Sequence, residues 1–303
     1  MKRSSRAGRL TQLERNQRTT GIFFILPSLV LCAIFMVVPL INVIRYSLTD
    51  WDGLSKTYNF VGLYNYMHLH EIEGFGEMML ATVTFAIGVT AITIIVSFLA
   101  ALALDKRGRD RLPRGLMRAL WFFPALLSGA VVGILWRIMY NYNNGVINKI
   151  ITSAGLPAVN WLETRGVTNI AIIIGAAWVQ IGLCVVVFLA GLQSIPQEMY
   201  EAASIDGATP SQQLKNITIP MMASSITINV ITTTIAAFKA YELPYLISKG
   251  LPGHSTLLIT QRIFFFGFQA FDYGRGSALS VVLLLSRIHV PAVIADTIST
   301  LAG

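Results

Sequence analysis

Residues 78–104 read MMLATVTFAIGVTAITIIVSFLAALAL, and this stretch decides the fold. It contains no charged side chain, and aliphatic and aromatic residues fill most of its positions. An α-helix needs about 20 apolar residues to cross the roughly 30 Å hydrocarbon core of a bilayer. The stretch is long enough for this and predicts a membrane-spanning helix.

Four further stretches have the same character and predict four more spans. Their charged residues are confined to the ends, where Arg137 and Lys239 can extend toward the membrane surface. The sequence therefore predicts an all-α membrane protein, a polytopic bundle of about six transmembrane helices over residues 22–295. The four stretches are residues 22–44, 119–138, 168–190 and 217–239.

The sixth segment, residues 277–295, is left open by its energetics. Arg287 at mid-membrane would cost roughly 3 kcal/mol. About nine large aliphatic residues, at about −0.5 kcal/mol each, would only just outweigh that cost before Pro291 is considered.

Composition argues against a soluble enzyme, a disordered chain and a nucleic-acid-binding domain. Hydrophobic residues make up 54% of the chain and charged residues 13%, with a mean hydropathy of +0.63. A soluble domain carries about 25% charged residues. Cys32 and Cys184 lie in apolar runs, where cysteine usually behaves as a small buried hydrophobe rather than a disulfide or metal ligand.

The net charge of +8 is concentrated beside the apolar runs. Twelve of the 23 Lys and Arg residues lie in residues 1–21 and 105–118, six in each. Such basic segments mark the cytoplasmic side of a membrane protein. We therefore expect a basic cytoplasmic tail over residues 1–21, a cytoplasmic N-terminus, and external loops over residues 45–77 and 138–167. Alternation then places residues 191–220 in the cytoplasm.

The loop over residues 191–220 reads GLQSIPQEMYEAASIDGATPSQQLKNITIP and has more order than a connector needs. Ser194 with Gln197 predicts a capping box that starts a short helix. Gly207 predicts the left-handed residue that ends this helix. Thr209 with Gln212 predicts a second capping box, with Pro210 at the first helical position.

Two interpretations of this helix pair stay open on physical grounds. It lies on the membrane surface as an interfacial pair, or it is a docking surface for a partner. Small residues at Ala202, Ala203 and Gly207 would let a partner approach closely. Glu201 and Asp206 would offer carboxylates to a basic groove.

The loop resembles the EAA motif of permease subunits of binding-protein-dependent ABC importers. That pattern is E-A-A, three residues, G, nine residues, and I-x-L-P. The chain supplies Glu201-Ala202-Ala203, then Gly207, then Ile217-Thr218-Ile219-Pro220, with Ile219 in place of the usual Leu.

Further segments resemble the carbohydrate-uptake branch of these importers, which includes maltose and glycerol-3-phosphate permeases. The likeness covers about residues 20–285, and the sequence then departs from it in an atypical C-terminal tail over residues 296–303. An altered terminus is one interpretation of that departure. The similar segments are Phe60 to Tyr66, Trp121 to Pro124, Asn160 to Leu162, Ile205 to Ala208, Pro252 to Thr256 and Gly276 to Val281.

This resemblance implies a type I ABC importer permease fold in a prokaryotic inner membrane. It also implies a second homologous permease subunit, an ABC ATPase dimer, an extracytoplasmic solute-binding protein and a carbohydrate substrate. In the family the EAA loop couples the permease to the ATPase. The coupling residues carried over by the motif are Glu201, Ala202, Ala203, Asp206, Gly207, Ile217 and Pro220.

No motif for catalysis, ATP, a cofactor or a metal is present. The sequence has no GxxxxGK[ST] phosphate loop, so we expect a transport subunit rather than an enzyme, with no cofactor. Gln180, Asn229 and Thr233 lie in apolar runs and either join helices or line a solute path. The alternative of a secondary transporter or channel for a small polar solute is disfavoured because the five spans lack Asp and Glu.

Overall fold

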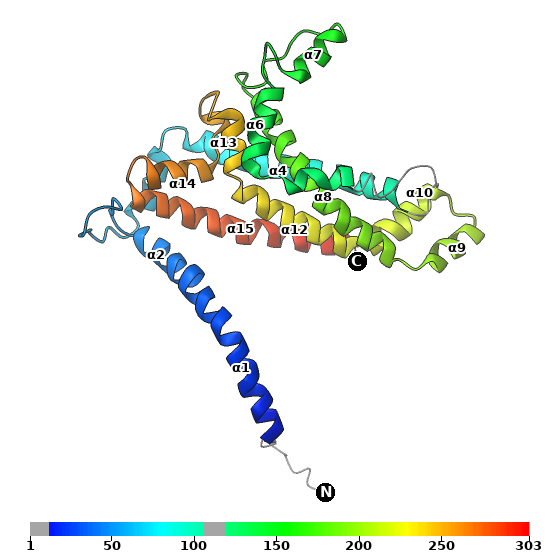
Figure 1. Ribbon diagram of the computed structural model, residues 1–303, viewed down its shortest axis with the longest axis horizontal. Coiled ribbons are helices and arrows are strands. Elements are labelled where there is room, and N and C mark those ends of the chain that lie inside the picture. The colour runs from blue at the N-terminus through cyan, green and yellow to red at the C-terminus, as the bar shows by residue number, and fades with distance from the viewer. Residues whose placement is uncertain (1–11, 106–118, 303) are drawn as a thin grey trace.

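The computed structural model describes residues 12–105 and 119–302, and these residues form helices joined by short loops (Figure 1). Among them the only strand-like pairing is a single bridge between Thr49 and Phe60. Three helices in the described part are long and apolar enough to cross a membrane. The number becomes five if each of two bent helix pairs is one span.

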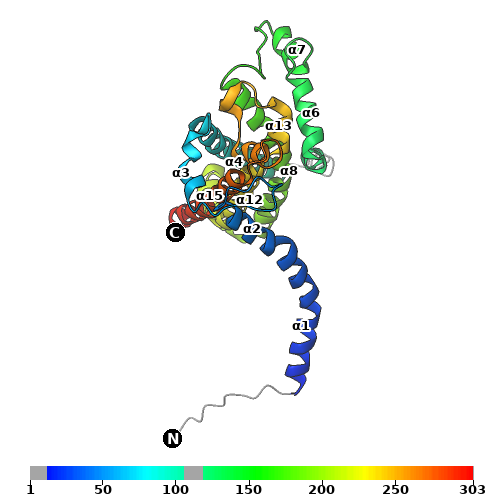
Figure 2. The same ribbon diagram turned by 90° about the vertical axis from the view of Figure 1, so that its left-hand side faces the viewer.

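The N-terminal helix extends away from the bundle in both views (Figures 1 and 2). It consists of α1 (Gln12–Cys32), a π-helical turn η1 (Ala33–Val37) and α2 (Val38–Tyr46). Its apolar segment Thr20–Tyr46 covers the predicted span 22–44. None of the residues in the most apolar part of this segment is buried. Residues 1–11 of the predicted basic tail lie outside the described residues, and helix already begins at Gln12.

The bundle is centred on α4 (Phe75–Leu104) and α8 (Val167–Ser194), which pack along each other. These helices contain the predicted spans 78–104 and 168–190. Small residues at the contact let the backbones approach, as is typical of membrane helix pairs. At Gly88 of α4, an added Cβ atom would lie 2.7 Å from the side chain of Ile173 on α8.

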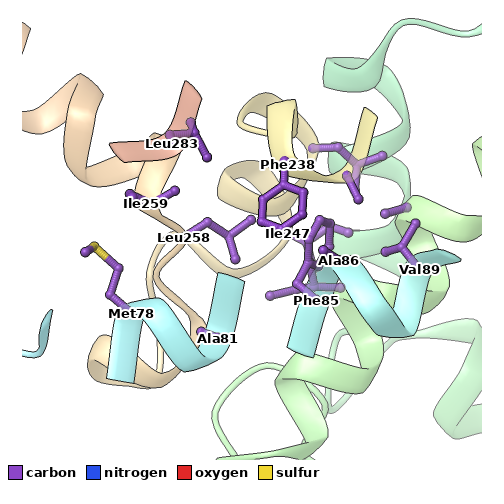
Figure 3. Close-up of a cluster of buried hydrophobic side chains, with 14 of the residues drawn as sticks. Met78, Ala81, Phe85, Ala86, Val89, Phe238, Ile247, Leu258, Ile259 and Leu283 are labelled. Carbon is purple, nitrogen blue, oxygen red and sulfur yellow. The ribbon is translucent and has the colours of Figure 1, made fainter. Parts of the chain in front are cut away.

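Helices of the C-terminal part of the chain close the rest of the bundle around a second set of contacts. Figure 3 shows Phe85 of α4 beside Phe238 and Ile247, whereas Leu283 lies near Ile259, and all five side chains are buried. Phe238, Ile247 and Leu283 come from α12 (Ala223–Lys239), α13 (Glu242–Ser248) and α15 (Tyr273–Ala302). Shorter elements at the periphery include α3 (Tyr64–Met67), η2 (Leu69–Glu71), α7 (Val146–Ser153), η5 (Gly253–Thr256) and α14 (Ile259–Phe268).

The run over residues 119–138 differs from the straight span that its hydropathy predicts. Ala119–Leu126, which ends in the 3-10 turn η3 (Phe123–Leu126), and α6 (Gly129–Met139) are bent by 107°. Pro124 lies at the start of this 3-10 turn, and the hydroxyl of Ser128 accepts a 3.4 Å hydrogen bond from the backbone N–H of Val131 to start the second helix. The basic residues 106–118 before this run lie outside the described residues.

The predicted span 217–239 is also broken. The helical stretch Pro210–Met221 and α12 are bent by 64° at Met222, which is fully buried. A π-helical turn η4 (Leu214–Thr218) and the short α11 (Ile219–Met221), which contains Pro220, precede the bend. Proline removes a backbone donor and the π-turn shifts the helical register, so both favour a break here.

The segment that energetics left open forms one continuous helix. α15 runs from Tyr273 to Ala302 and covers residues 277–295, with Pro291 inside it. Most of the predicted tail 296–303 therefore continues this helix. In the described part of the chain, α15 is not among the helices that are long and apolar enough to cross a membrane.

Candidate functional site

The loop between α8 and α12 forms a helical projection at one end of the bundle (Figure 1). It contains α9 (Gln197–Ile205) and α10 (Pro210–Gln213). Its base is anchored in a buried apolar cluster to which Leu192, Ile195 and Met222 belong. Tyr200 and Ile217 of the loop pack against the same cluster. The projection is therefore fixed to the helices that it connects.

The turn after α9 is a Schellman motif, and Gly207 occupies its left-handed position. The φ angle of Gly207 is +79°. The N–H of Ala208 donates to the carbonyl of Ala203 at 2.8 Å, and the N–H of Gly207 donates to the carbonyl of Ser204 at 3.1 Å. These two bonds satisfy carbonyls that the end of a helix leaves free. The prediction that Gly207 ends this helix is confirmed.

Of the two predicted capping boxes, one is confirmed and one is wrong. The Thr209 hydroxyl accepts from the N–H of Gln212, and Gln212 Oε1 accepts from the N–H of Thr209. Ser194 instead remains in α8, where its hydroxyl donates to the carbonyl of Gly191 at 2.7 Å. α9 begins after Pro196 without a side-chain cap. Because α8 extends to Ser194, this residue lies before the N-cap position of α9, which Pro196 occupies.

Two side-chain hydrogen bonds join the parts of the loop. The hydroxyls of Tyr200 on α9 and Thr218 in η4 share a 2.9 Å bond. Gln213 Nε2 donates to the Ser204 hydroxyl at 2.9 Å. The two helices and the π-turn before α12 are thus linked into one unit. The sequence did not predict these two hydrogen bonds, because their partners lie on opposite sides of the Gly207 turn and the sequence does not show how that turn orients the two helices.

The outer face of the loop is exposed and carries the motif residues. Glu201, Ala202, Asp206 and Gly207 are exposed, whereas Ala203 is half-buried. Glu201 accepts a 2.9 Å hydrogen bond from Gln197 Nε2. A Cβ atom on Gly207 would meet no atom within 4 Å, so this side of the turn is open.

Ile205 is the most exposed large apolar residue of the loop and was not singled out from the sequence. Its exposed fraction is 86%, and it lies between the acidic residues Glu201 and Asp206. Of the other motif residues, Ile217 is half-buried against the apolar cluster and Pro220 is exposed in α11. The arrangement is a small knob with an apolar tip and acidic flanks, suited to a concave partner surface with basic groups.

The residues predicted to join helices or line a solute path lie where α12 meets α8. Asn229 is 2% exposed, and its Nδ2 donates to the carbonyl of Cys184 at 3.3 Å. The Thr233 hydroxyl lies 3.4 Å from Cys184 Sγ. Gln180, one turn earlier on α8, is half-buried. The contacts of Asn229 and Thr233 join the two helices, and a role of these residues in a solute path stays a prediction.

Titratable residues do not gather into a metal or catalytic centre in the described part of the chain. There, no group of three or more His, Cys, Asp or Glu residues could hold a metal ion.

A protein-family comparison matches residues 93–299 to a family described as binding-protein-dependent transport system inner membrane component. The trehalose/maltose transport system permease protein MalF of Thermococcus litoralis is 32% identical over 279 residues, 91% of this chain and 93% of that protein. The diacetylchitobiose uptake system permease protein NgcF of Streptomyces coelicolor is 30% identical, over 91% of this chain and 81% of that protein.

A solved structure shares the fold over nearly the whole length. It is a chain of a bacterial alginate ABC transporter in complex with an alginate pentasaccharide-bound periplasmic protein. The TM-score is 0.81, with 19% sequence identity, and the match covers 96% of this chain and 97% of that chain. At this identity the match shows the fold alone.

Proposed function

Because the chain belongs to the family of inner membrane components of binding-protein-dependent transport systems, we propose that it forms part of the membrane pathway for a carbohydrate. It is a permease subunit of an ABC importer and not an enzyme. The relatives named for trehalose and maltose and for diacetylchitobiose support a saccharide as the solute. An extracytoplasmic binding protein would deliver this solute, and a second permease subunit would complete the pathway.

The energy for transport comes, in this proposal, from a separate ABC ATPase dimer that contacts the loop over residues 191–220. The single observation that carries this step is the knob formed by α9 and its Schellman turn, anchored at its base and exposed at Ile205. Its acidic flanks, Glu201 and Asp206, suit a basic cleft. The Gly207 turn leaves open space where a partner surface would approach.

Movement of the knob would reach the membrane through one hydrogen bond and the helical segment that follows it. The Tyr200–Thr218 bond ties α9 to the π-turn η4, and η4 leads through α11 into the bend at Met222. A bend at a proline and a π-turn is a place where loop displacement becomes helix tilt. Closure of the ATPase dimer would thus tilt α12 against α8, where Asn229 bonds to the carbonyl of Cys184.

Docking to the ATPase would require the knob to lie in the cytoplasm, and the proposed topology of the other segments follows from this. The basic segments 1–21 and 105–118 then lie on the same side, and the N-terminus is cytoplasmic. The apolar side chains of residues 22–46 are exposed along most of α1 and α2. Lipid and the second permease subunit are the surfaces proposed to cover them.

Gene deletion followed by uptake measurements tests the function. Loss of uptake of one labelled saccharide, restored by the intact gene, is the expected result. Affinity purification of the tagged chain in mild detergent should also recover an ATPase and a second permease. Uptake of every tested saccharide at the parental rate, together with recovery of the chain alone, would contradict the proposal and favour a secondary transporter.

A further inference from the structure

Arg287 is a cation inside α15 with an unsatisfied donor. Its Nε atom is buried and has no hydrogen-bond partner among the described residues. The residue lies 14 positions after Tyr273, about 21 Å along the helix at 1.5 Å per residue. Charged side chains at membrane depth are rare and usually mark a function. The proposed coupling loop and the α8–α12 contacts make no use of this residue.

Arg287 shares a cavity with a second cation, Lys239. The cavity has a volume of about 350 Å³ and lies between α2, α12, α14 and α15. Thr260 and Ser280 contribute hydroxyls to its wall, and the other lining residues are aliphatic, among them Leu40 and Leu284. The described residues that line it include no carboxylate. The exposed Lys239 and the half-buried Arg287 therefore border one mainly apolar space.

The hydroxyls in the wall do not compensate the cations, because they already bond to backbone. The Thr260 hydroxyl donates to the carbonyl of Ala240 at 2.7 Å, and the Ser280 hydroxyl donates to the carbonyl of Gly276 at 2.8 Å. Lys239 ends α12, where the helix dipole favours a cation. Arg287 lies far inside its helix and has no such helix end, and the described residues that line the cavity offer it no counter-charge.

We propose that this cavity binds the anionic substituent, a carboxylate or a phosphate, of the carbohydrate that the chain translocates. The inference rests on the proposed transport function and narrows its substrate class to acidic or phosphorylated saccharides. A planar guanidinium binds such groups through two parallel hydrogen bonds, and a lysine adds a point charge. A neutral sugar would leave both cations unpaired. The volume lies within the range of small-molecule sites.

Binding is tested on the purified full-length chain in detergent, with glucuronate, glucose 6-phosphate and glucose as probes. The two anions should raise the melting temperature of the parent, and glucose should not. Arg287→Gln and Lys239→Gln should each raise, at least tenfold, the anion concentration needed to reach half of the increase in melting temperature. Arg275→Gln is the matched control, because Arg275 lies on the same helix, pairs with Asp272 at 3.3 Å and does not line the cavity.

The melting temperature without ligand separates a binding role from a structural one. Arg287→Gln removes a half-buried cation whose buried Nε has no partner among the described residues, so the ligand-free variant should melt at the parental temperature or above it. A lower melting temperature, with no response of the parent to either anion, would overturn the proposal. Native mass spectrometry tests a lipid as the occupant. If the parent retained phosphatidylglycerol and Arg287→Gln lost it, with no response of either to the sugars, the cavity would be a lipid site and the proposal would be overturned.

Uptake by cells separates failure of this site from failure of transport. In a deletion strain complemented with the parent gene, an acidic or phosphorylated saccharide should be taken up. Arg287→Gln should lower that uptake at least tenfold, and Arg275→Gln should not. Uptake restricted to neutral saccharides, at equal rates in parent and Arg287→Gln, would overturn the anion site and leave transport standing. A deletion without effect on any saccharide would overturn the transport function itself.

Discussion

The hydroxyl of Tyr200 lies 2.9 Å from the hydroxyl of Thr218, and this bond joins α9 to the π-turn η4 that precedes the bend into α12. Thr218 is buried, and the Tyr200 ring packs against the apolar cluster at the base of the loop. Force applied to α9 therefore has a direct polar route to the bend at Met222. The proposed coupling depends on this contact.

Tyr200→Phe should weaken coupling while keeping the packing of the ring. The loss of one hydrogen bond costs about 0.5–1.5 kcal/mol. We expect transport per ATP hydrolysed to fall several-fold in reconstituted vesicles. Tyr66→Phe is the matched control, because it removes a 2.7 Å bond to the Ser47 hydroxyl outside the loop. Equal losses of transport in the two variants would show that only stability had changed.

Gly207→Asn should separate docking from folding. Asn tolerates the left-handed conformation better than other residues, and the space around Gly207 is open. Folding should therefore lose about 1 kcal/mol or less, while the new side chain obstructs the partner. Gly155→Asn is the control, since Gly155 has the same φ of +79° and equally open space in a loop predicted to be external. Normal recovery of the ATPase with Gly207→Asn would contradict docking at this turn.

Ile205→Ala should reduce ATPase recovery without loss of stability. The side chain is 86% exposed, so folding gains little from it, whereas a partner pocket would gain the energy of its burial, about 1.5–3 kcal/mol. A tenfold or greater weakening of ATPase binding, measured with purified components, is expected. Ile150→Ala on α7, whose side chain is 63% exposed, should leave binding unchanged. Matching affinities of Ile205→Ala and the parent would remove Ile205 from the interface.

Reporter fusions test the orientation. Fusion after residue 110 should place the reporter in the cytoplasm, and fusion after residue 155 should place it outside. The reason is the excess of Lys and Arg in the 105–118 loop over the 138–167 loop. The measurement is the activity of alkaline phosphatase and of green fluorescent protein at each site. Activity of the same reporter at both sites would refute the topology.

The chain by itself should not bind or hydrolyse ATP, because its sequence contains no phosphate loop. Equilibrium binding of a labelled ATP analogue to the purified chain should give no saturable signal. A saturable signal that persists after repurification, and that Mg²⁺ strengthens, would contradict this prediction.

Local sequence patterns determined much of the fold and of the candidate loop. Hydrophobic runs over 22–44, 78–104 and 168–190 correspond to long helices, because a chain in lipid must satisfy its backbone groups within each helix. Gly207 and the Thr209–Gln212 box fixed the turn and the second helix start, since both depend only on residues within one turn. The family motif depends on the same short spacings.

Only the tertiary structure decided the features that depend on distant neighbours. Hydropathy averages over a run, so it did not reveal the bends at residues 127–128 and at Met222. The Tyr200–Thr218 bond, the burial of Asn229 against Cys184 and the cavity shared by Lys239 and Arg287 each join residues from different elements. Their positions follow from how the helices cross, and crossing is set by packing of whole surfaces rather than by any local run of sequence.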